Sequence, residues 1–134
     1  NAAFGIPEVK RGLAAAAGGL FRLPARIPYQ VAMELALTGN FLPARRGYEL
    51  GLVNRISEAG QALAVARQLA AEIAANGPLA VRASKQVVAR SVDWPAAEGF
   101  TRQLDIVGPV LGSADAREGA AAFAEKRAPR WQGK

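Results

Sequence analysis

The sequence predicts a mainly α-helical fold with one to three short strands. Prolines and glycines alternate along the chain, so that a proline opens several segments and a glycine closes them, which is typical of helix starts and ends. Within these segments apolar residues recur at intervals of three or four positions, a spacing that places them on one face of a helix. Extended segments are few and short. The chain therefore folds as a helical layer or packs on a sheet that lies elsewhere.

The first segments are the least regular. Residues 1–13 are predicted to end a strand and to start a turn or short helix. Residues 14–19 contain only Ala and Gly, which favours a loop or helix start where the backbone can approach another group closely. Pro28 then opens a helix over residues 29–38, and Gly39 is its expected C-terminal cap.

The same alternation predicts the remaining elements. Pro43 opens a segment that Gly51 closes, and residues 52–56 are a short apolar run of extended type. An interior proline removes a hydrogen bond and clashes with the preceding turn, so we expect a kink or stop near Pro109. Asp115 begins a pattern that fits a capping box with Asp in place of Ser or Thr. The later helices are predicted at residues 61–75, 78–91, from 95 to about 108, and 115–126.

Composition excludes several classes of function. The 134 residues include no cysteine and no histidine, so disulfides, Cys or His zinc sites and a Ser-His triad are excluded, and acid/base chemistry must use carboxylates, Lys or Tyr. No apolar run or signal pattern indicates a membrane span or secretion, so we expect no membrane and a cytoplasmic location. The net charge is +6, but the basic residues are dispersed. We therefore expect no nucleic acid partner.

Glu8 is the first candidate for chemistry. It follows a proline and precedes a glycine-rich segment over residues 12–19. That segment lacks both the Gly-Lys-Ser/Thr ending of a Walker A motif and the Gly-x-Gly-x-x-Gly spacing of a dinucleotide fingerprint, so it is not a nucleotide loop. Taken alone, the pattern also fits an exposed glutamate at a turn.

Phe123 and Lys126 are the second candidate. They lie three positions apart on one face of the last predicted helix, where an aromatic ring and an ammonium could hold a flat base and meet a phosphate. The alternative is that Phe123 belongs to the core and Lys126 is its solvated neighbour.

These segments occur together and in the order that is found in the enoyl-CoA hydratase/isomerase (crotonase) family. The resemblance runs from Phe4 to Trp131, and it corresponds to the C-terminal half of a family member roughly twice as long. The matching segments are Phe4-Gly5-Ile6-Pro7-Glu8-Val9-Lys10-Arg11-Gly12, Gly18-Gly19 with Arg22-Leu23, Leu37-Thr38-Gly39, Gly51-Leu52-Val53, Ser113-Ala114-Asp115-Ala116-Arg117-Glu118-Gly119, and Ala122-Phe123-Ala124-Glu125-Lys126-Arg127 with Pro129.

The resemblance implies a role for each candidate residue. Glu8 corresponds to the general acid/base that moves a proton at the α-carbon of an acyl-CoA thioester through an enolate. Phe123 and Lys126 correspond to positions at which the C-terminal helix of a neighbouring subunit contacts the adenosine of coenzyme A and its 3′-phosphate. Ala16 lies near the backbone that helps to hold the attacking water. Ala15-Ala16 stand where Pro-Gly is common in the family, and this departure weakens the case for hydratase chemistry.

The resemblance also implies how the chain is organised. Residues 1–27 would be the end of the catalytic core, and residues 28–134 a helical region for oligomerisation and CoA binding. The N-terminal half, with the sheet repeats, the oxyanion-hole N–H groups and a further carboxylate, is missing from this sequence. The expected partners are an acyl-CoA thioester, the missing half, and copies in a homo-trimer or hexamer.

The implied activity is that of a lyase or isomerase of fatty acid metabolism. It is enoyl-CoA hydration or double-bond isomerisation, with coenzyme A as substrate carrier and with no prosthetic group or metal. Because the oxyanion donors lie in the missing half, this chain alone is expected to be inactive. The alternative is a non-catalytic helical assembly module of the same family.

Overall fold

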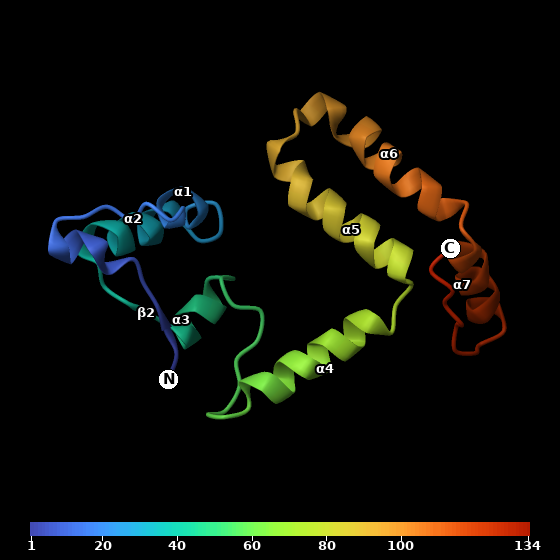
Figure 1. Cartoon of the computed structure of the whole chain (residues 1–134), viewed down its shortest axis with the longest axis horizontal. Helices are drawn as coiled ribbons and strands as arrows, with labels where there is room; N and C mark the ends of the chain where they lie inside the picture. The colour runs from blue at the N-terminus through green and yellow to red at the C-terminus, as the bar shows by residue number, and fades with distance from the viewer. The chain divides into compact units, whose positions relative to one another are not determined.

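Helices form most of the structure (Figure 1). The computed structural model describes residues 1–134. Its α-helices are α1 (Gly19–Arg22), α2 (Tyr29–Thr38), α3 (Ala44–Glu49), α4 (Ala62–Ala74), α5 (Pro78–Arg90), α6 (Gly99–Leu111) and α7 (Ala114–Ala124). There are also 3₁₀ helices η1 (Pro7–Arg11), η2 (Ser91–Asp93) and η3 (Ala96–Glu98), and strands β1 (Ala3–Phe4) and β2 (Leu42–Pro43). The predicted class, mainly α with one to three short strands, is confirmed.

The chain divides into two compact units. Unit 1 comprises residues 1–66 and unit 2 comprises residues 67–134, so the division falls within α4. The sequence predicts a different division, in which residues 1–27 end the catalytic core and residues 28–134 serve oligomerisation and CoA binding. That division concerns function rather than packing, and it stays a prediction.

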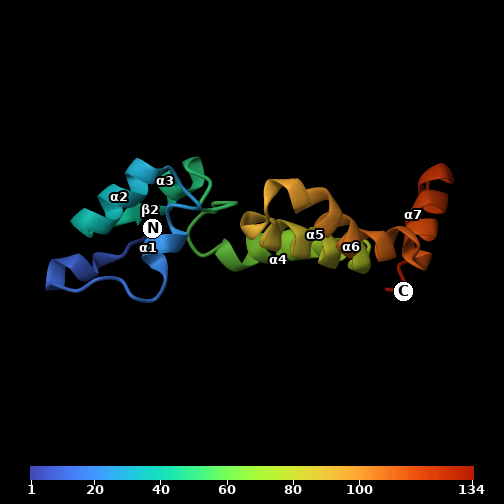
Figure 2. The ribbon, with the colours of Figure 1, turned by 90° about the horizontal axis from the view of Figure 1, so that it is seen from above.

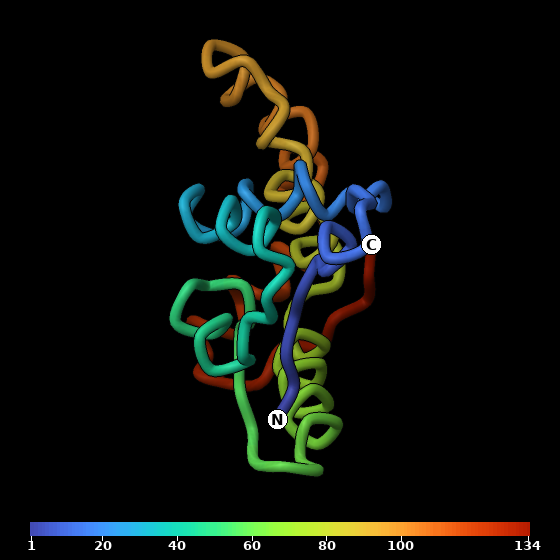
Figure 3. Tube along the Cα trace, turned by 90° about the vertical axis from the view of Figure 1, so that its left-hand side faces the viewer, coloured from blue at the N-terminus to red at the C-terminus, as the bar shows by residue number.

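Strand pairing fixes the start of unit 1. β1 and β2 are antiparallel, with Ala3 opposite Pro43 and Phe4 opposite Leu42. The extended N-terminal segment that contains β1 is the dark blue tube in Figure 3. Because only Gly5 and Ile6 separate β1 from η1, this pairing also positions the segment that carries Glu8.

The core of unit 1 forms around α2. Ala32 and Leu35 are buried and lie three positions apart, so one face of this helix points inward. Full burial of a leucine side chain stabilises a fold by about 2 kcal/mol. The buried residues are Ile27, Ala32, Leu35 and Leu42, and the half-buried Leu23, Val31, Leu50 and Leu52 pack against them.

Unit 2 is built on a helical hairpin. α5 and α6 lie side by side and run in opposite directions (Figures 1 and 2), and η2 and η3 lie in the turn between them. The indole of Trp131 then holds the end of the chain, because its Nε1–H donates to the main-chain oxygen of Ala75 at 2.8 Å. A β-carbon at Gly119 would lie 3.3 Å from the Trp131 ring, so the indole also lies close against α7.

Two departures from the predicted elements lie at residues 52–56 and at Pro109. Residues 52–56 form no strand; instead the main-chain N–H groups of Leu52 and Val53 both donate to the oxygen of Gly47. α6 continues through Pro109 to Leu111. Since this proline lies in the last turn of the helix, it removes a single hydrogen bond near the end, and the helix stops two residues later instead of breaking.

Candidate functional site

The turn that carries Glu8 is fixed at both ends. Pro7 is the first residue of η1 and supplies a preset φ angle. Gly12 ends the turn with a φ of 69°, a left-handed conformation that favours glycine, and its N–H donates to the main-chain oxygen of Val9 at 3.2 Å. The N–H of Leu13 donates to the oxygen of Glu8, also at 3.2 Å. The local sequence therefore holds the backbone of Glu8 rigidly.

The carboxylate of Glu8 has an unusual environment. The residue is half-buried, and its Oε2 atom is buried without a hydrogen-bond partner. A buried carboxylate oxygen normally accepts a hydrogen bond, because leaving it unpaired costs at least about 1–3 kcal/mol. An acceptor held in this state is suited to receive a proton from a bound molecule. One of the two carboxylate oxygens is therefore shielded from solvent, which an exposed glutamate at a turn would not show.

Helix α2 supports this turn from behind. Its cap Gly39 has a φ of 63°, and a β-carbon there would lie 3.1 Å from side-chain atoms of both Val9 and Lys10. The ammonium of Lys10 donates to Oδ1 of Asn40 at 3.1 Å. The close approach of α2 thus leaves little room for the Glu8 turn to shift.

Ala16 lies in the loop that follows. It is exposed, in a turn that ends at Gly18, the residue before α1. Its methyl group offers no chemistry, so any contribution to binding must come from its backbone. Glu8 and Ala16 are in the same unit; Glu8 precedes the glycine-rich segment and Ala16 lies within it.

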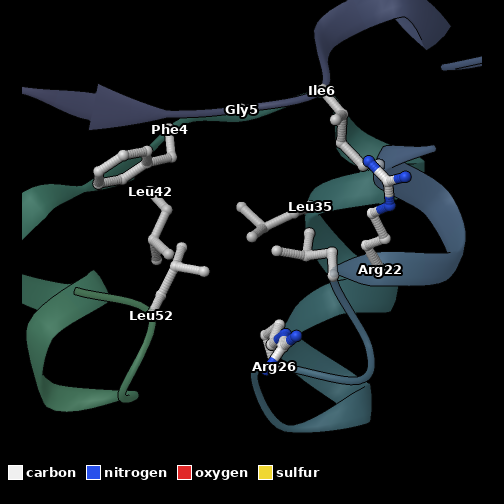
Figure 4. A pocket seen from close by; sticks show the side chains of 10 residues that line it. Phe4, Gly5, Ile6, Arg22, Arg26, Leu35, Leu42 and Leu52 are labelled. Atoms are coloured by element: carbon white, nitrogen blue, oxygen red, sulfur yellow. The ribbon is translucent and has the colours of Figure 1, made fainter. Parts of the chain in front are cut away.

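An apolar pocket of about 250 Å³ opens in unit 1 (Figure 4). The side chains of Arg22 and Arg26 reach it from the α1 side, while β1 supplies Phe4. No local sequence pattern reveals this pocket, because its walls come from segments that are distant in sequence. The lining residues are Phe4, Gly5, Ile6, Gly19, Arg22, Leu23, Arg26, Leu35, Leu42 and Leu52, and Glu8 is not among them.

Phe123 is on α7 and is 88% exposed. It is therefore not part of the core of unit 2, which removes the alternative that it is a core residue in this chain. Lys126 lies two residues beyond the end of α7. The expectation that both side chains share one helical face is wrong, because the helix ends at Ala124.

The backbone at Lys126 is left-handed, with a φ of 55°, and Lys126 is the only residue other than glycine with a positive φ. Its N–H donates to the oxygen of Phe123 at 3.2 Å, and the N–H of Arg127 donates to that of Ala122 at 3.0 Å. This pair of bonds is the Schellman motif that commonly ends a helix with glycine. A left-handed lysine costs roughly 1–2 kcal/mol, and such outliers cluster at functional sites.

A strong ion pair lies behind this turn. Nη1 and Nη2 of Arg127 donate to Oε1 and Oε2 of Glu118 at 2.6 and 3.0 Å, and the main-chain N–H of Arg130 donates to Oε1 of Glu118 at 2.7 Å. These donors lower the pKa of Glu118 to about 2, with the hydrogen bond from Arg127 as the main cause. The same contacts raise the pKa of Arg127 above its usual range.

Asp115 has a different role from the predicted one. Helix α7 is capped by Ser113, whose Oγ accepts from the N–H of Ala116 at 3.0 Å, so the capping box at Asp115 is wrong. Ser113 comes two residues earlier and already satisfies the free N–H group. Asp115 is only 4% exposed and accepts from the main-chain N–H groups of Gln132 and Gly133 at 2.6 and 2.9 Å. It holds the end of the chain against α7.

The family model for enoyl-CoA hydratase/isomerase matches residues 1–134. The chain belongs to the enoyl-CoA hydratase/isomerase family. The resemblance found in the motifs is thereby confirmed. A crystal structure of an enoyl-CoA hydratase from Mycobacterium tuberculosis is 59% identical to this family member with a TM-score of 0.97, and the match covers 100% of this chain and 53% of that one.

Two curated relatives extend the comparison. Enoyl-CoA hydratase EchA19 of Mycobacterium tuberculosis is 43% identical over 98% of this chain and 50% of its own length. Carnitinyl-CoA dehydratase of Salmonella typhi is 37% identical over 100% of this chain and 53% of its own length. The chain spans about half the length of the curated relatives it matches.

The candidate residues of this family member fall into two groups. Glu8 and Ala16 belong to unit 1, whereas Phe123 and Lys126 belong to unit 2. Sequence analysis missed Glu118 and Arg127 because their pairing depends on a turn rather than on helical spacing. No group of three or more Asp, Glu, His or Cys residues lies together as a metal site would require. None of the helices combines the length and apolar character needed to cross a bilayer.

Proposed function

We propose that this chain is the C-terminal part of an enzyme that hydrates enoyl-CoA thioesters, or dehydrates the corresponding hydroxyacyl-CoA, with Glu8 as acid/base. The observation that carries the proposal is the buried, unpartnered Oε2 of Glu8 on a turn that is fixed at both ends. Family membership supports a CoA thioester as the substrate. Relatives named as a hydratase and a dehydratase favour hydration chemistry over double-bond isomerisation.

The proposed step is a proton transfer at carbon. In hydration, the oxygen of water bonds to the β-carbon and loses a proton to a base, for which the further carboxylate expected in the N-terminal half is proposed, while protonated Glu8 delivers its proton to the α-carbon. Dehydration is the reverse. Both directions pass through an enolate, whose oxygen must be stabilised by preorganised donors. Isomerisation would use the same carboxylate to move one proton without adding water. It is the alternative reaction for the same site.

Phe123 and Lys126 are proposed to bind the carrier. An exposed phenyl ring can stack on adenine, and the ammonium of Lys126, which has no hydrogen bond or ion pair in the structure, is available to a phosphate. Ala16 is proposed to contribute its backbone beside the reacting carbon. Coenzyme A is then a substrate carrier, and the chemistry needs no prosthetic group.

The whole protein is proposed to contain a further N-terminal half. The half-length coverage of the relatives supports this, and that half would supply the oxyanion donors. A homo-trimer or hexamer, a place in fatty acid metabolism and a cytoplasmic location stay predictions. The proposed polypeptide, in which this chain is the C-terminal half, is called the full-length protein.

The decisive test is Glu8→Gln in the full-length protein. We expect turnover of crotonyl-CoA to fall by about a hundredfold or more, the usual scale for a positioned acid/base group, while the affinity for CoA changes little. Glu34→Gln is the matched control, because Glu34 is an exposed carboxylate on α2 in the same unit. Near-normal turnover in the Glu8 variant would overturn the proposal.

The rival function is a non-catalytic assembly module. Large apolar side chains that lie open on the helices support it, such as Leu63 on α4, Phe100 on α6 and Leu37 on α2. The two functions are separated by measuring thermal stability with free CoA together with oligomeric state. If the chain forms trimers but CoA causes no thermal shift, assembly alone is favoured.

A further inference from the structure

Lys126 lies between two residues whose side chains bind each other. Nε of Arg127 donates to Oε2 of Glu125 at 2.5 Å, while the two terminal nitrogens of the same guanidinium hold Glu118. One cation is thus shared by two carboxylates, one within α7 and one at its C-terminal cap. The main-chain turn at Lys126 is closed by side-chain contacts on both sides.

We infer that Arg127 is a positioning residue for Lys126: by holding Glu118 and Glu125, it keeps the turn closed and leaves the ammonium of Lys126 free for the phosphate of the CoA carrier. The inference rests on the proposed function, which assigns Lys126 to the carrier. It adds two residues, Arg127 and Glu118, that act on the carrier through Lys126.

The backbone at Lys126 needs support from its neighbours. The left-handed conformation at Lys126 is unfavourable for a residue with a β-carbon, so neighbouring contacts must maintain it. The hydrogen bond from the N–H of Arg127 to Ala122 supplies one contact, and the bidentate pair with Glu118 supplies a second, more directional one. Without the side-chain pair, the turn can relax, and the backbone position from which the Lys126 side chain extends is no longer fixed.

The charges around Lys126 matter as well. The Arg127 guanidinium engages both carboxylates, whereas the Lys126 ammonium has no partner. Lysine carries its charge on a flexible stem with three donors that can turn to any nearby anion. If Arg127 is replaced, Glu125 is left beside Lys126 in sequence with no cation partner. An internal ion pair would then compete with the phosphate of the ligand.

The test compares two ligands that differ by one phosphate. Calorimetry of the full-length protein would measure the affinities for CoA and for 3′-dephospho-CoA. Arg127→Gln is expected to weaken CoA binding about tenfold, the scale of a lost charge-assisted hydrogen bond, and to change 3′-dephospho-CoA binding by less than about twofold. In a Lys126→Gln background, Arg127→Gln should add nothing further, because the two residues act on the same phosphate.

Arg130→Gln is the matched control. It removes one positive charge but keeps the main-chain N–H that Glu118 accepts, so both affinities should stay within about twofold. Arg127→Lys tests the same idea if Arg127→Gln fails to fold, because it keeps the charge and loses the two-pronged contact. An intermediate, phosphate-dependent loss is expected for it.

Equal losses for the two ligands, or additive losses in the double variant, would overturn the inference and leave Arg127 a purely structural residue. So would tight CoA binding by either Arg127 variant. These outcomes differ from failure of the proposed function, which would appear as absent CoA binding in the unaltered protein or as unimpaired turnover in Glu8→Gln.

Discussion

Lys126 occupies a backbone conformation that glycine adopts at lower cost. Its φ of 55° places it in the left-handed region, at the helix end where glycine is the usual residue. Glu8 is also in an unfavourable state, since its Oε2 is buried without a partner. Both residues give up local stability, and both are the residues proposed to touch the substrate.

Lys126→Gly is therefore expected to stabilise unit 2. Relief of the left-handed strain, less the extra chain entropy of glycine, should raise the free energy of unfolding by about 0.5–1 kcal/mol. Urea unfolding followed by circular dichroism would measure it. Ala120→Gly is the matched control within α7, where glycine should instead destabilise by about 1 kcal/mol. A destabilised Lys126→Gly variant would contradict the strain argument.

At this scale the sequence predicts which residue types carry chemistry but not their environments. Motifs single out Glu8, Phe123 and Lys126, yet the burial of Oε2 of Glu8 depends on tertiary packing, and the strain at Lys126 depends on where α7 ends. The local pattern at Asp115 predicts a helix cap. It cannot reveal that the carboxylate accepts hydrogen bonds from Gln132 and Gly133, which lie 17 and 18 residues later. Side-chain contacts across a turn leave no periodic signal.

At the scale of elements, the segment after α7 is held by two carboxylates of that helix. Glu118 holds Arg127 and the N–H of Arg130, and Asp115 holds the N–H groups of Gln132 and Gly133. The main-chain oxygen of Lys134 in turn accepts from the N–H of Ala114 at 2.9 Å, near the start of α7. These hydrogen bonds hold the irregular segment 127–134 against α7.

The Glu118 contacts predict a specific acid sensitivity. The folded-state pKa of Glu118 is about 2, against an ordinary value of 4.5. Its contribution to stability is complete above pH 4.5 and is lost as the pH falls from 4.5 towards 2. Urea midpoints across this range should fall more steeply for the natural chain than for Glu118→Gln. Glu34→Gln should keep the steep dependence, and equal slopes for all three proteins would contradict the prediction.

Helices are the elements that the sequence predicts best. The helix expected over residues 29–38 is α2 as observed, and the Pro78 helix ends within one residue of its prediction. Apolar spacing and end residues are local properties, which explains this success. The strand pair is harder to predict from the sequence, because β1 and β2 have only two residues each and lie far apart in the chain.

At the scale of the whole molecule, the chain supplies a proposed acid/base group and a proposed carrier contact, whereas the oxyanion donors are proposed to come from the N-terminal half. Enolate formation requires the acid/base group and these donors to be held around one thioester. Loss of one donor typically costs about 3 kcal/mol of transition-state stabilisation. The match covers all of this chain but only 53% of each of two relatives, which is consistent with donors that lie in another half of the protein.

We accordingly expect the isolated 134-residue chain to lack measurable crotonyl-CoA hydration. We also expect it to associate, because exposed apolar side chains favour partner contacts. Enzyme assays and light scattering on the same preparation would test both points. Robust hydration by a stable monomer would refute the account.

The Trp131 contact has a consequence for biosynthesis. The indole bonds to Ala75, 56 residues earlier in the chain, whereas every hydrogen bond described within unit 1 can form once residue 66 has been made. Domains generally fold as they emerge from the ribosome, beginning with the N-terminal one. The bond to Ala75 can therefore form only after residue 131 has emerged, later than the hairpin of α5 and α6, which needs no residue beyond Leu111.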